Sequence, residues 1–388
     1  MTSTTDPCLT LLSELVAIDS VNPSLVHGGA GESRIAAFIA EYLQRLGLDV
    51  HVQEAAPGRS NVIGVLESGA PGPSLMFCGH IDTVGVEGMQ SPFEPVTRDG
   101  RLYGRGAQDM KGGVAAMIDA ARAARERGFH RGRLIIAAVV DEEYASLGAD
   151  TLVHEWRADA AIVTEPTDLQ IGVGHKGFAW FEIETAGRAA HGSRPREGRD
   201  AILRMGRVLT RLEQLDRELQ SRPAHPVMGT ASLHASIVTG GSEWSSYPDR
   251  CVLQMERRTV AGETSGSAEA EIATILGALR SLDPEFAASS KLIFSRPPYE
   301  TPAGHGITAL LRICAHKRGV NAEPVGMSFW TDAAILGGAG VPSVLFGPGG
   351  AGLHSIEEYV NTADVIACRD VLADVARAWS SGPQVLGS

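Results

Sequence analysis

The stretch Leu75–Val84, LMFCGHIDTV, decides how this chain folds. Four apolar residues are followed by Gly79, a pattern typical of a buried strand in a parallel sheet that ends in a turn. Ligands of open α/β sheets bind beyond the carboxyl ends of such strands. His80 and Asp82 follow this strand, and residues two apart on an extended backbone share one face. The pair suits a metal site in which His80 is a ligand and Asp82 orients its ring.

Length and composition narrow the class of protein. The chain has 388 residues, of which 44% are hydrophobic, so we expect two domains or one large domain with an insertion. The net charge of −12 argues against nucleic acid and membranes as partners, and no apolar stretch approaches the about 18 residues of a membrane span. Five scattered cysteines without CxxC spacing and no visible signal peptide predict a cytoplasmic protein without disulfides.

Acidic residues and a second histidine follow other apolar segments. Asp141, Glu142 and Glu143 follow the run 133–140, Glu165 follows 160–163, and His354 follows a strand and a glycine-rich loop. The stretch GRGAQDMKGG (104–113) does not have the spacing of a nucleotide-binding loop, and it contains one acidic residue, Asp109. Each segment alone fits a solvated loop. Together the ends of the predicted strands supply His80, Asp82, Asp109, Glu142, Glu143, Glu165 and His354.

This set of side chains favours a metal site. Imidazoles and carboxylates without cysteine suit Zn²⁺, with Co²⁺ or Mn²⁺ as substitutes. Five ligands can hold two metals about 3.5–4 Å apart if one carboxylate bridges them. A carboxylate that is not a ligand can then take the proton from the attacking water. Chemistry of this type hydrolyses an amide or an ester.

The pattern changes between Gly177 and Ser295. Strands and helices there follow the order β-α-β-β-α-β, the split-βαβ arrangement, over the length of a small domain. We therefore expect an α/β protein with a discontinuous catalytic domain, residues 1–176 and 296–388, whose mixed sheet is flanked by helices. A ferredoxin-like α+β domain at 177–295 is expected to be inserted into it.

Eight motifs in order carry a family resemblance: GHIDTV (79–84), SPFEP (91–95), GRGAQDMKGG (104–113), DEE (141–143), TEPT (164–167), GRAAHGSRP (187–195), ERRTVAGE (256–263) and GPGG…HSIEEY (347–359). Through them the chain resembles the metal-dependent aminoacylases, acetylornithine deacetylases, succinyl-diaminopimelate desuccinylases and glutamate carboxypeptidases. Single motifs are unspecific, whereas the ordered set is highly specific and spans nearly the whole chain.

The resemblance implies a site with two Zn²⁺ per chain. One metal would be bound by His80, Asp109 and Glu165. The other would be bound by Asp109, Glu143 and His354, so that Asp109 bridges the two.

The resemblance also implies roles for residues that are not metal ligands. Asp82 would orient the first histidine ligand, and Glu142 would be the general base and later the acid for the leaving amine. His191 would stabilise the oxyanion, often in the site of the partner subunit, so the insert would be a lid and dimerisation domain of a homodimer. Arg258 would pair with a substrate carboxylate, and the Gly349-Gly350 loop would line the substrate pocket.

Three functions remain open at this point. The first is hydrolysis of an N-acyl amino acid, of the deacetylase or desuccinylase type. The second is a carboxypeptidase or dipeptidase that cleaves a short peptide with the same metals; the stretch from SPFEP to GRGAQDMKGG is more similar to the deacetylase branch. The third, a non-catalytic binding protein, predicts loss of the base or of a ligand, but Glu142 and the five ligand positions are present.

The sequence departs from the family at one turn. Relatives often carry Asn there, whereas this chain has Trp244 and then Ser245-Ser246-Tyr247. These two aromatic residues indicate either a substrate other than the usual small, polar acyl amino acid or rings that pack the insert or its dimer edge.

Overall fold

The computed structural model describes residues 6–381, which form two compact units. Unit 1 contains the described residues up to Val173, together with Thr301–Val325 and the chain from Thr331 onward. Unit 2 contains Gly174–Glu300 and Gly326–Trp330. The segment expected as an insertion, 177–295, lies within unit 2.

Unit 1 is built around a mixed sheet with the strand order β1-β2-β6-β3-β7-β15-β8-β13, in which β14 also pairs with β8; β13 and the last two residues of β8 and of β14 belong to unit 2. The strands of this sheet are β1 (Asp49–Ala56), β2 (Arg59–Glu67), β3 (Ser74–His80), β6 (Arg133–Val139), β7 (Ala160–Val163), β8 (Ile171–His175), β13 (Tyr299–Glu300), β14 (Pro324–Met327) and β15 (Ser343–Leu345). The helices are α1 (Pro7–Val16), α2 (Ser33–Arg45), α3 (Gly112–Arg127), α4 (Leu147–Glu155), α7 (Gly306–Lys317), α8 (Ala333–Gly338) and α9 (Thr362–Ser380).

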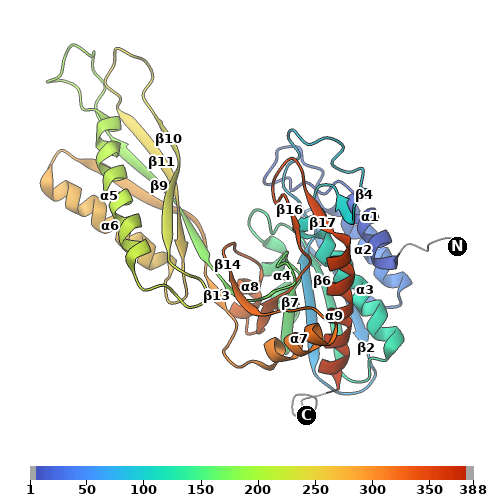
Figure 1. Ribbon diagram of the computed structural model, residues 1–388. Coiled ribbons are helices and arrows are strands. Elements are labelled where there is room, and N and C mark those ends of the chain that lie inside the picture. The colour runs from blue at the N-terminus through green and yellow to red at the C-terminus, as the bar shows by residue number, and fades with distance from the viewer. Residues whose placement is uncertain (1–5, 382–388) are drawn as a thin grey trace. The chain divides into compact units, whose positions relative to one another are not determined.

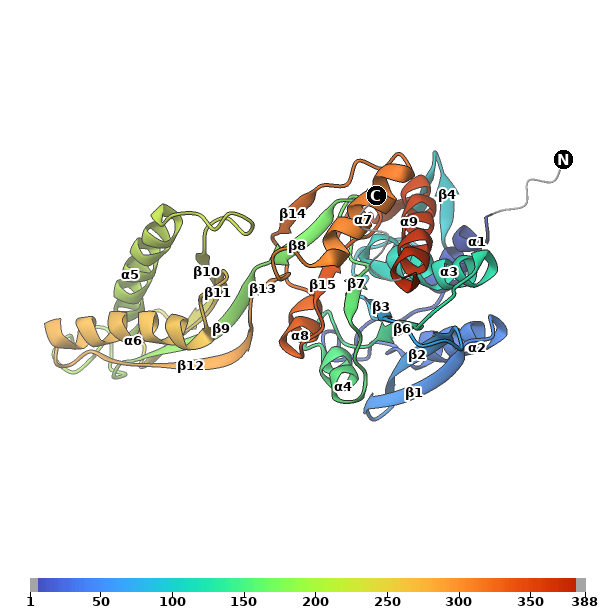
Figure 2. The same cartoon turned by 90° about the horizontal axis from the view of Figure 1, so that it is seen from below.

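Helices cover both faces of the central strands. Leu75 and Phe77 of β3 belong to the core that α1, α2, α3, α7 and α9 close, whereas α4 and α8 lie on the other side of the sheet (Figure 2). Met76 and Cys78, which alternate with them, are also fully buried. This burial on both faces explains why the strand reads as a continuous apolar run. Because β6, β3, β7 and β15 are parallel neighbours, their carboxyl ends meet at one edge.

A second, small sheet combines two strands from the segment between β3 and α3 with two strands from the segment before α9. Its strand order is β16-β17-β5-β4, with β4 (Val96–Arg98), β5 (Arg101–Tyr103), β16 (Gly350–Ala351) and β17 (Tyr359–Asn361). Strands of two or three residues are too short to show an alternating pattern.

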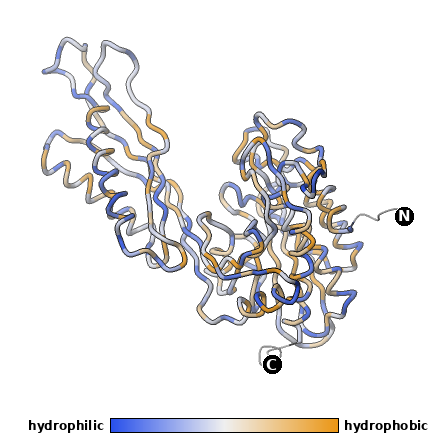
Figure 3. The backbone as a smooth tube through the Cα atoms, viewed as in Figure 1, coloured by the Kyte–Doolittle hydropathy of each residue, from blue (hydrophilic) through white to orange (hydrophobic). Residues whose placement is uncertain are grey.

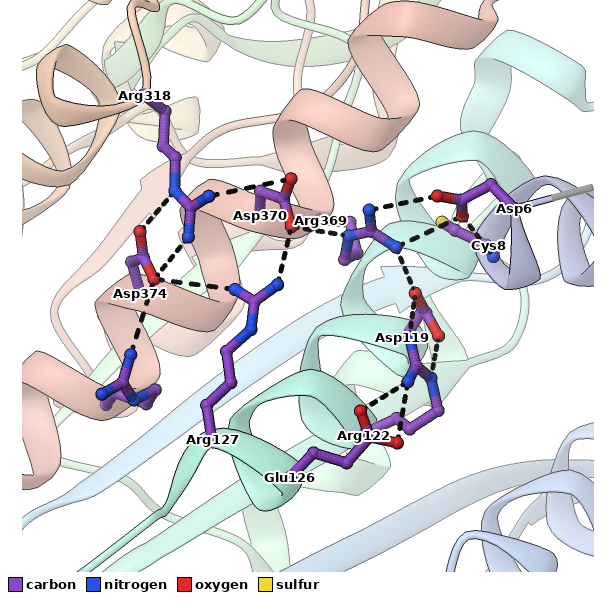
Figure 4. Close-up of polar contacts among 11 residues, drawn as sticks. Asp6, Cys8, Asp119, Arg122, Glu126, Arg127, Arg318, Arg369, Asp370 and Asp374 are labelled. Carbon is purple, nitrogen blue, oxygen red and sulfur yellow. Dashed lines mark hydrogen bonds and ion pairs between the residues drawn. The ribbon is translucent and has the colours of Figure 1, made fainter.

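A buried ion-pair network ties the helices of unit 1 together (Figure 4). Arg369 of α9 donates to Asp119 of α3 at 2.7 Å and to Asp6, the N-cap of α1, at 3.2 Å. Arg122 donates to the same Asp119 carboxylate at 2.6 Å. Asp119 is fully buried and depends on these partners, since removing one partner of a buried pair typically costs about 3–5 kcal/mol.

Unit 2 has the element order β-α-β-β-α-β that the sequence predicted (Figure 1). Its sheet has the order β10-β11-β9-β12, and its elements are β9 (Gly177–Ala186), α5 (Ala201–Ser221), β10 (Ser232–Gly240), β11 (Arg250–Thr259), α6 (Ser265–Leu282) and β12 (Ala287–Arg296). Both helices pack on one face of the sheet, where residues at helical spacing such as Met205, Val208 and Leu212 are buried. Hydrophobic and hydrophilic residues alternate along these helices accordingly (Figure 3).

The predicted fold class is therefore confirmed: an α/β unit with a large mixed sheet, and a small antiparallel α+β unit. Within residues 6–381, no helix is long and apolar enough to cross a membrane.

Candidate metal centre

Two histidines of unit 1 lie close to different oxygens of one carboxylate. Asp109 lies in an irregular π-helical turn, η1 (Ala107–Lys111), after β5, and His80 is the last residue of β3. The Nε2 atom of His80 lies 3.1 Å from Asp109 Oδ1, and the Nε2 atom of His354, from the loop between β16 and β17, lies 3.4 Å from Oδ2. Each oxygen of Asp109 therefore faces a different imidazole, as a bridging carboxylate requires.

Three glutamates surround this arrangement. His354 Nε2 lies 3.1 Å from Glu143 Oε2, and His80 Nε2 lies 4.0 Å from both Glu142 Oε2 and Glu165 Oε1. Among residues 6–381, two groups have ligand atoms that all lie within 4.8 Å of one another: His80, Glu142 and Glu165; and His80, Asp109 and Glu143. The structure thus brings together all five predicted ligands and the predicted base. The base, Glu142, lies as close to His80 and Glu165 as a metal ligand would.

The carboxylates carry negative charge that the protein compensates only in part. Burial raises the pKa of Glu142, and the charge of Glu165 adds to this shift. Burial and the charge of Asp109 raise the pKa of Glu143 to about 7. The buried Glu143 Oε1 has no hydrogen-bond partner among the described residues. An all-oxygen and nitrogen donor set with excess negative charge fits divalent cations.

The histidines show the complementary shifts. Hydrogen bonds to Asp109 and Glu143 raise the pKa of His354 to about 10. Burial opposes the charged form of Asp109, but hydrogen bonds from His354 and His80 outweigh it and lower the pKa of that carboxyl.

Asp82 holds both sides of the site in place. Its Oδ1 lies 3.5 Å from His80 Nδ1, which also lies 3.1 Å from the Asp82 backbone carbonyl. The backbone N–H of Glu142 donates to Oδ1 at 3.1 Å, and that of Glu143 donates to Oδ2 at 3.2 Å. Asp82 therefore contacts the histidine that it was predicted to orient and also fixes the backbone of the two glutamates.

A buried network behind Asp82 was not predicted from the sequence. Asn22 donates through Nδ2 to Asp82 at 2.8 Å and to Asp141 at 3.0 Å. Arg59 pairs with Asp141 at 2.7 Å and donates through Nε to Glu32 at 2.9 Å. Asp141 thus points away from the cluster, unlike the two glutamates that follow it. No motif in the sequence marked Asn22, and the adjacency of Asp141 to Glu142 and Glu143 gave no sign of its different role.

Two other predicted site residues belong to unit 2 and are not part of the cluster in unit 1. His191 lies in an exposed loop, with its Nδ1 2.8 Å from Ser193 Oγ. Arg258 on β11 donates through Nε to Glu256 Oε1 at 2.6 Å, and its guanidinium lies 5.6 Å from the ring centroid of Phe178.

The glycine loop and the unusual turn are also resolved. A Cβ on Gly349 would meet Asp168 Oδ1 at 2.4 Å, so a side chain there would displace this carboxylate; the predicted place of the loop in the substrate pocket stays a prediction. Tyr247 packs within the insert, because a Cβ on Gly198 would meet its ring at 2.4 Å. Trp244 is fully exposed, so packing does not account for it within the chain.

Known proteins share about 30% of this sequence over nearly the whole chain, and a solved structure shares its fold. The N-formyl-4-amino-5-aminomethyl-2-methylpyrimidine deformylase of Bacillus subtilis (strain 168) is 30% identical over 383 residues, covering 89% of each chain. The acetylornithine deacetylase of Myxococcus xanthus is 31% identical over 384 residues, covering 96% of this chain and 97% of that protein. A tripeptidase structure from Staphylococcus aureus has a TM-score of 0.81 at 22% identity, covering 97% of this chain and 98% of the other, which shows the shared fold.

The family described as Peptidase family M20/M25/M40 matches residues 76–378, a segment that contains the whole cluster. The predicted resemblance is thereby confirmed. The chain belongs to peptidase family M20/M25/M40 and is a metallohydrolase that acts on C–N bonds.

Proposed function

We propose that this protein removes the acyl group from an N-acyl amino acid, using two Zn²⁺ ions held by the cluster in unit 1. The observation that carries the proposal is the Asp109 carboxylate, which faces His80 with one oxygen and His354 with the other. The names of two relatives that are about as long as this chain, a deformylase and a deacetylase, support deacylation over peptide cleavage.

The ligands divide into two sets that share Asp109. His80, Asp109 and Glu165 would hold one ion; Asp109, Glu143 and His354 would hold the other. Divalent ions bound there would polarise the substrate carbonyl and make a water molecule more acidic. Co²⁺ or Mn²⁺ would serve in place of Zn²⁺ with the same donors.

Glu142 is the proposed general base. It stands at the carboxyl end of β6, and its backbone N–H donates to Asp82 at 3.1 Å, which fixes the start of its side chain. The carboxylate takes a proton from the attacking water as the new C–O bond forms. It then gives that proton to the amine nitrogen as the C–N bond breaks, so that the carboxylate is restored.

Unit 2 is proposed to supply substrate contacts and the dimer interface. Arg258 would bind the carboxylate of the amino acid, and His191 would stabilise the oxyanion, in the partner's site if the chains pair as in the family. The edge strand β10 supports pairing with a second copy, because its exposed side chains include Ile237 and Val238. The Gly349-Gly350 loop would line the substrate pocket.

A hydrolysis screen tests this function. N-acetyl, N-formyl, N-succinyl and N-aromatic-acyl amino acids are compared with dipeptides, each with Zn²⁺, with Co²⁺ and with chelator. We expect turnover of an N-acyl amino acid that chelator abolishes and Zn²⁺ restores. Faster turnover of dipeptides would favour a peptidase. The Glu142→Gln protein, purified identically, is the control for a contaminating hydrolase.

A further inference from the structure

The two segments that bring Asp109 and His354 together are irregular. Asp109 follows β5, and His354 lies between β16 and β17. Strand β17 pairs with β5 on one side, for example Val360 with Leu102, and with β16 on the other. This pairing brings the segments close, but it ends before either ligand. Something other than strand pairing must therefore fix the distance between the two side chains.

A buried carboxylate holds the segment that carries Asp109. Glu358, the residue before β17, is 1% exposed. Its Oε2 accepts the N–H of Gly106 at 2.9 Å, and its Oε1 accepts the N–H groups of Gln108 at 2.9 Å and Asp109 at 3.0 Å. Three backbone N–H groups of this turn thus bind one carboxylate, which belongs to the segment that carries His354.

A buried guanidinium completes the connection. Arg105, 3% exposed, donates through Nη1 to Glu358 Oε2 at 2.7 Å and through Nη2 to the carbonyl oxygen of Ser355 at 2.9 Å. Its Nε donates to the carbonyl oxygen of Gly85 at 3.1 Å, in the loop that follows His80. Arg105 therefore belongs to the segment that carries Asp109, and its side chain contacts the segments that carry His80 and His354.

This connection matters most for His354. The His354 side chain is 56% exposed and its backbone has a φ of 56°, in the left-handed region, so packing around the ring does little to place it. Ser355, the next residue, is held by Arg105. The position of this imidazole therefore depends on the Arg105–Glu358 pair.

A purely stabilising role does not explain these contacts. Burying an ion pair often gains little over apolar packing, because both charges are desolvated. The Arg369–Asp119 pair of the same unit joins helices, whereas the contacts of Arg105 and Glu358 are directed at ligand-bearing segments. We propose that Arg105 and Glu358 are positioning residues that set the spacing of Asp109 and His354 for their shared metal ion. This inference rests on the two-metal site proposed above.

The test measures Zn²⁺ binding rather than activity. Metal-depleted full-length protein is titrated with Zn²⁺ by calorimetry, and the visible spectrum of the Co²⁺-loaded protein is recorded. Glu358→Gln replaces an oxygen that accepts N–H groups by a donor. Arg105→Lys keeps the buried charge, and with it the fold, but loses the planar fork that reaches three acceptors. Asp119→Asn is the matched control, since it weakens a buried ion pair with no contact to these segments.

We expect two Zn²⁺ in the wild type. In both variants, the ion shared by Asp109 and His354 should bind about 10–100-fold more weakly, a larger loss than that of the other ion, which Asp109 also binds. Asp119→Asn is expected to lower the melting temperature but to bind both ions like the wild type. The positioning role would be overturned if both variants bind two ions as tightly as the wild type. It would also be overturned if Asp119→Asn loses as much Zn²⁺ affinity as they do. Fewer than two ions in the wild type would overturn the two-metal site itself. If Glu358→Gln does not fold, Arg105→Lys decides by the same measurement.

Discussion

Acidification is expected to destabilise unit 2 through His175. This histidine is fully buried at the end of β8, against the rings of Tyr299 and Trp330. Its Nδ1 lies 3.0 Å from the carbonyl oxygen of Lys176, and its Nε2 has no hydrogen-bond partner among the described residues. Burial lowers the pKa of His175 from 6.5 to about 4. The folded unit therefore holds a neutral imidazole that an unfolded chain would protonate.

The size of the effect follows from these two pKa values. Between them the unfolded chain binds a proton that the folded chain excludes, so the stability present above pH 6.5 is lost progressively as the pH falls towards 4. The difference of about 2.5 between the pKa values of the unfolded and the folded state corresponds to about 3.4 kcal/mol in total. Of this, about 2 kcal/mol is already lost at pH 5.

Urea unfolding of wild type and His175→Phe at pH 7.5 and pH 5 measures this loss of stability. Phenylalanine keeps the ring contacts but loses the hydrogen bond to Lys176, which costs about 1 kcal/mol. The variant should be less stable by about 1 kcal/mol at pH 7.5 and more stable by about 1 kcal/mol at pH 5. His234→Phe, at a histidine whose side chain is 62% exposed, is the control and should show no such crossing. If wild type and His175→Phe differ in their free energy of unfolding by the same amount at both pH values, the reasoning is refuted.

Three further predictions concern catalysis. Glu142→Gln should lower kcat by about 10²–10⁴-fold with Zn²⁺ content unchanged; if it instead loses metal while Glu143→Gln stays active, the two roles are exchanged. Arg258→Ala should weaken kcat/KM for N-acyl amino acids by about 2–5 kcal/mol and spare their carboxamides; an equal fall for both would make Arg258 a partner of Glu256 alone. Mixing inactive His191→Ala and Glu142→Ala chains should restore part of the activity, and a mixture that stays inactive after verified subunit exchange would exclude action of His191 in the partner's site.

The sequence predicted the parts of the site that follow regular strands. His80, Glu142, Glu143 and Glu165 each end or follow a buried apolar strand, and parallel pairing of these strands brings their ends to one edge. Asp109 and His354 could be added only through the resemblance and their glycine-rich surroundings. The order of elements in unit 2 could be predicted because its amphipathic helices and alternating strands are long.

The residues that hold the predicted site residues in place, such as Asn22 and Arg105, could not be predicted, for a different reason. Asn22 reaches Asp82 across 60 residues and Asp141 across 119, and Arg105 reaches Glu358 across 253. No local pattern marks an arginine or an asparagine whose partners lie so far away in the chain. Such contacts follow from the sheet order, which short motifs do not determine.

The insert leaves and rejoins its host at neighbouring positions. Its first and last strands pair with each other, with Phe178 opposite Arg296, and His175 pairs with Tyr299 one step closer to unit 1. Paired residues of antiparallel strands lie about 4.5–5.5 Å apart, so a tight turn would close the host chain without the insert. Apart from Gly326–Trp330, unit 2 is thus one continuous cassette. Such a cassette can be exchanged as one segment, while all residues of the candidate metal centre stay encoded in the host chain.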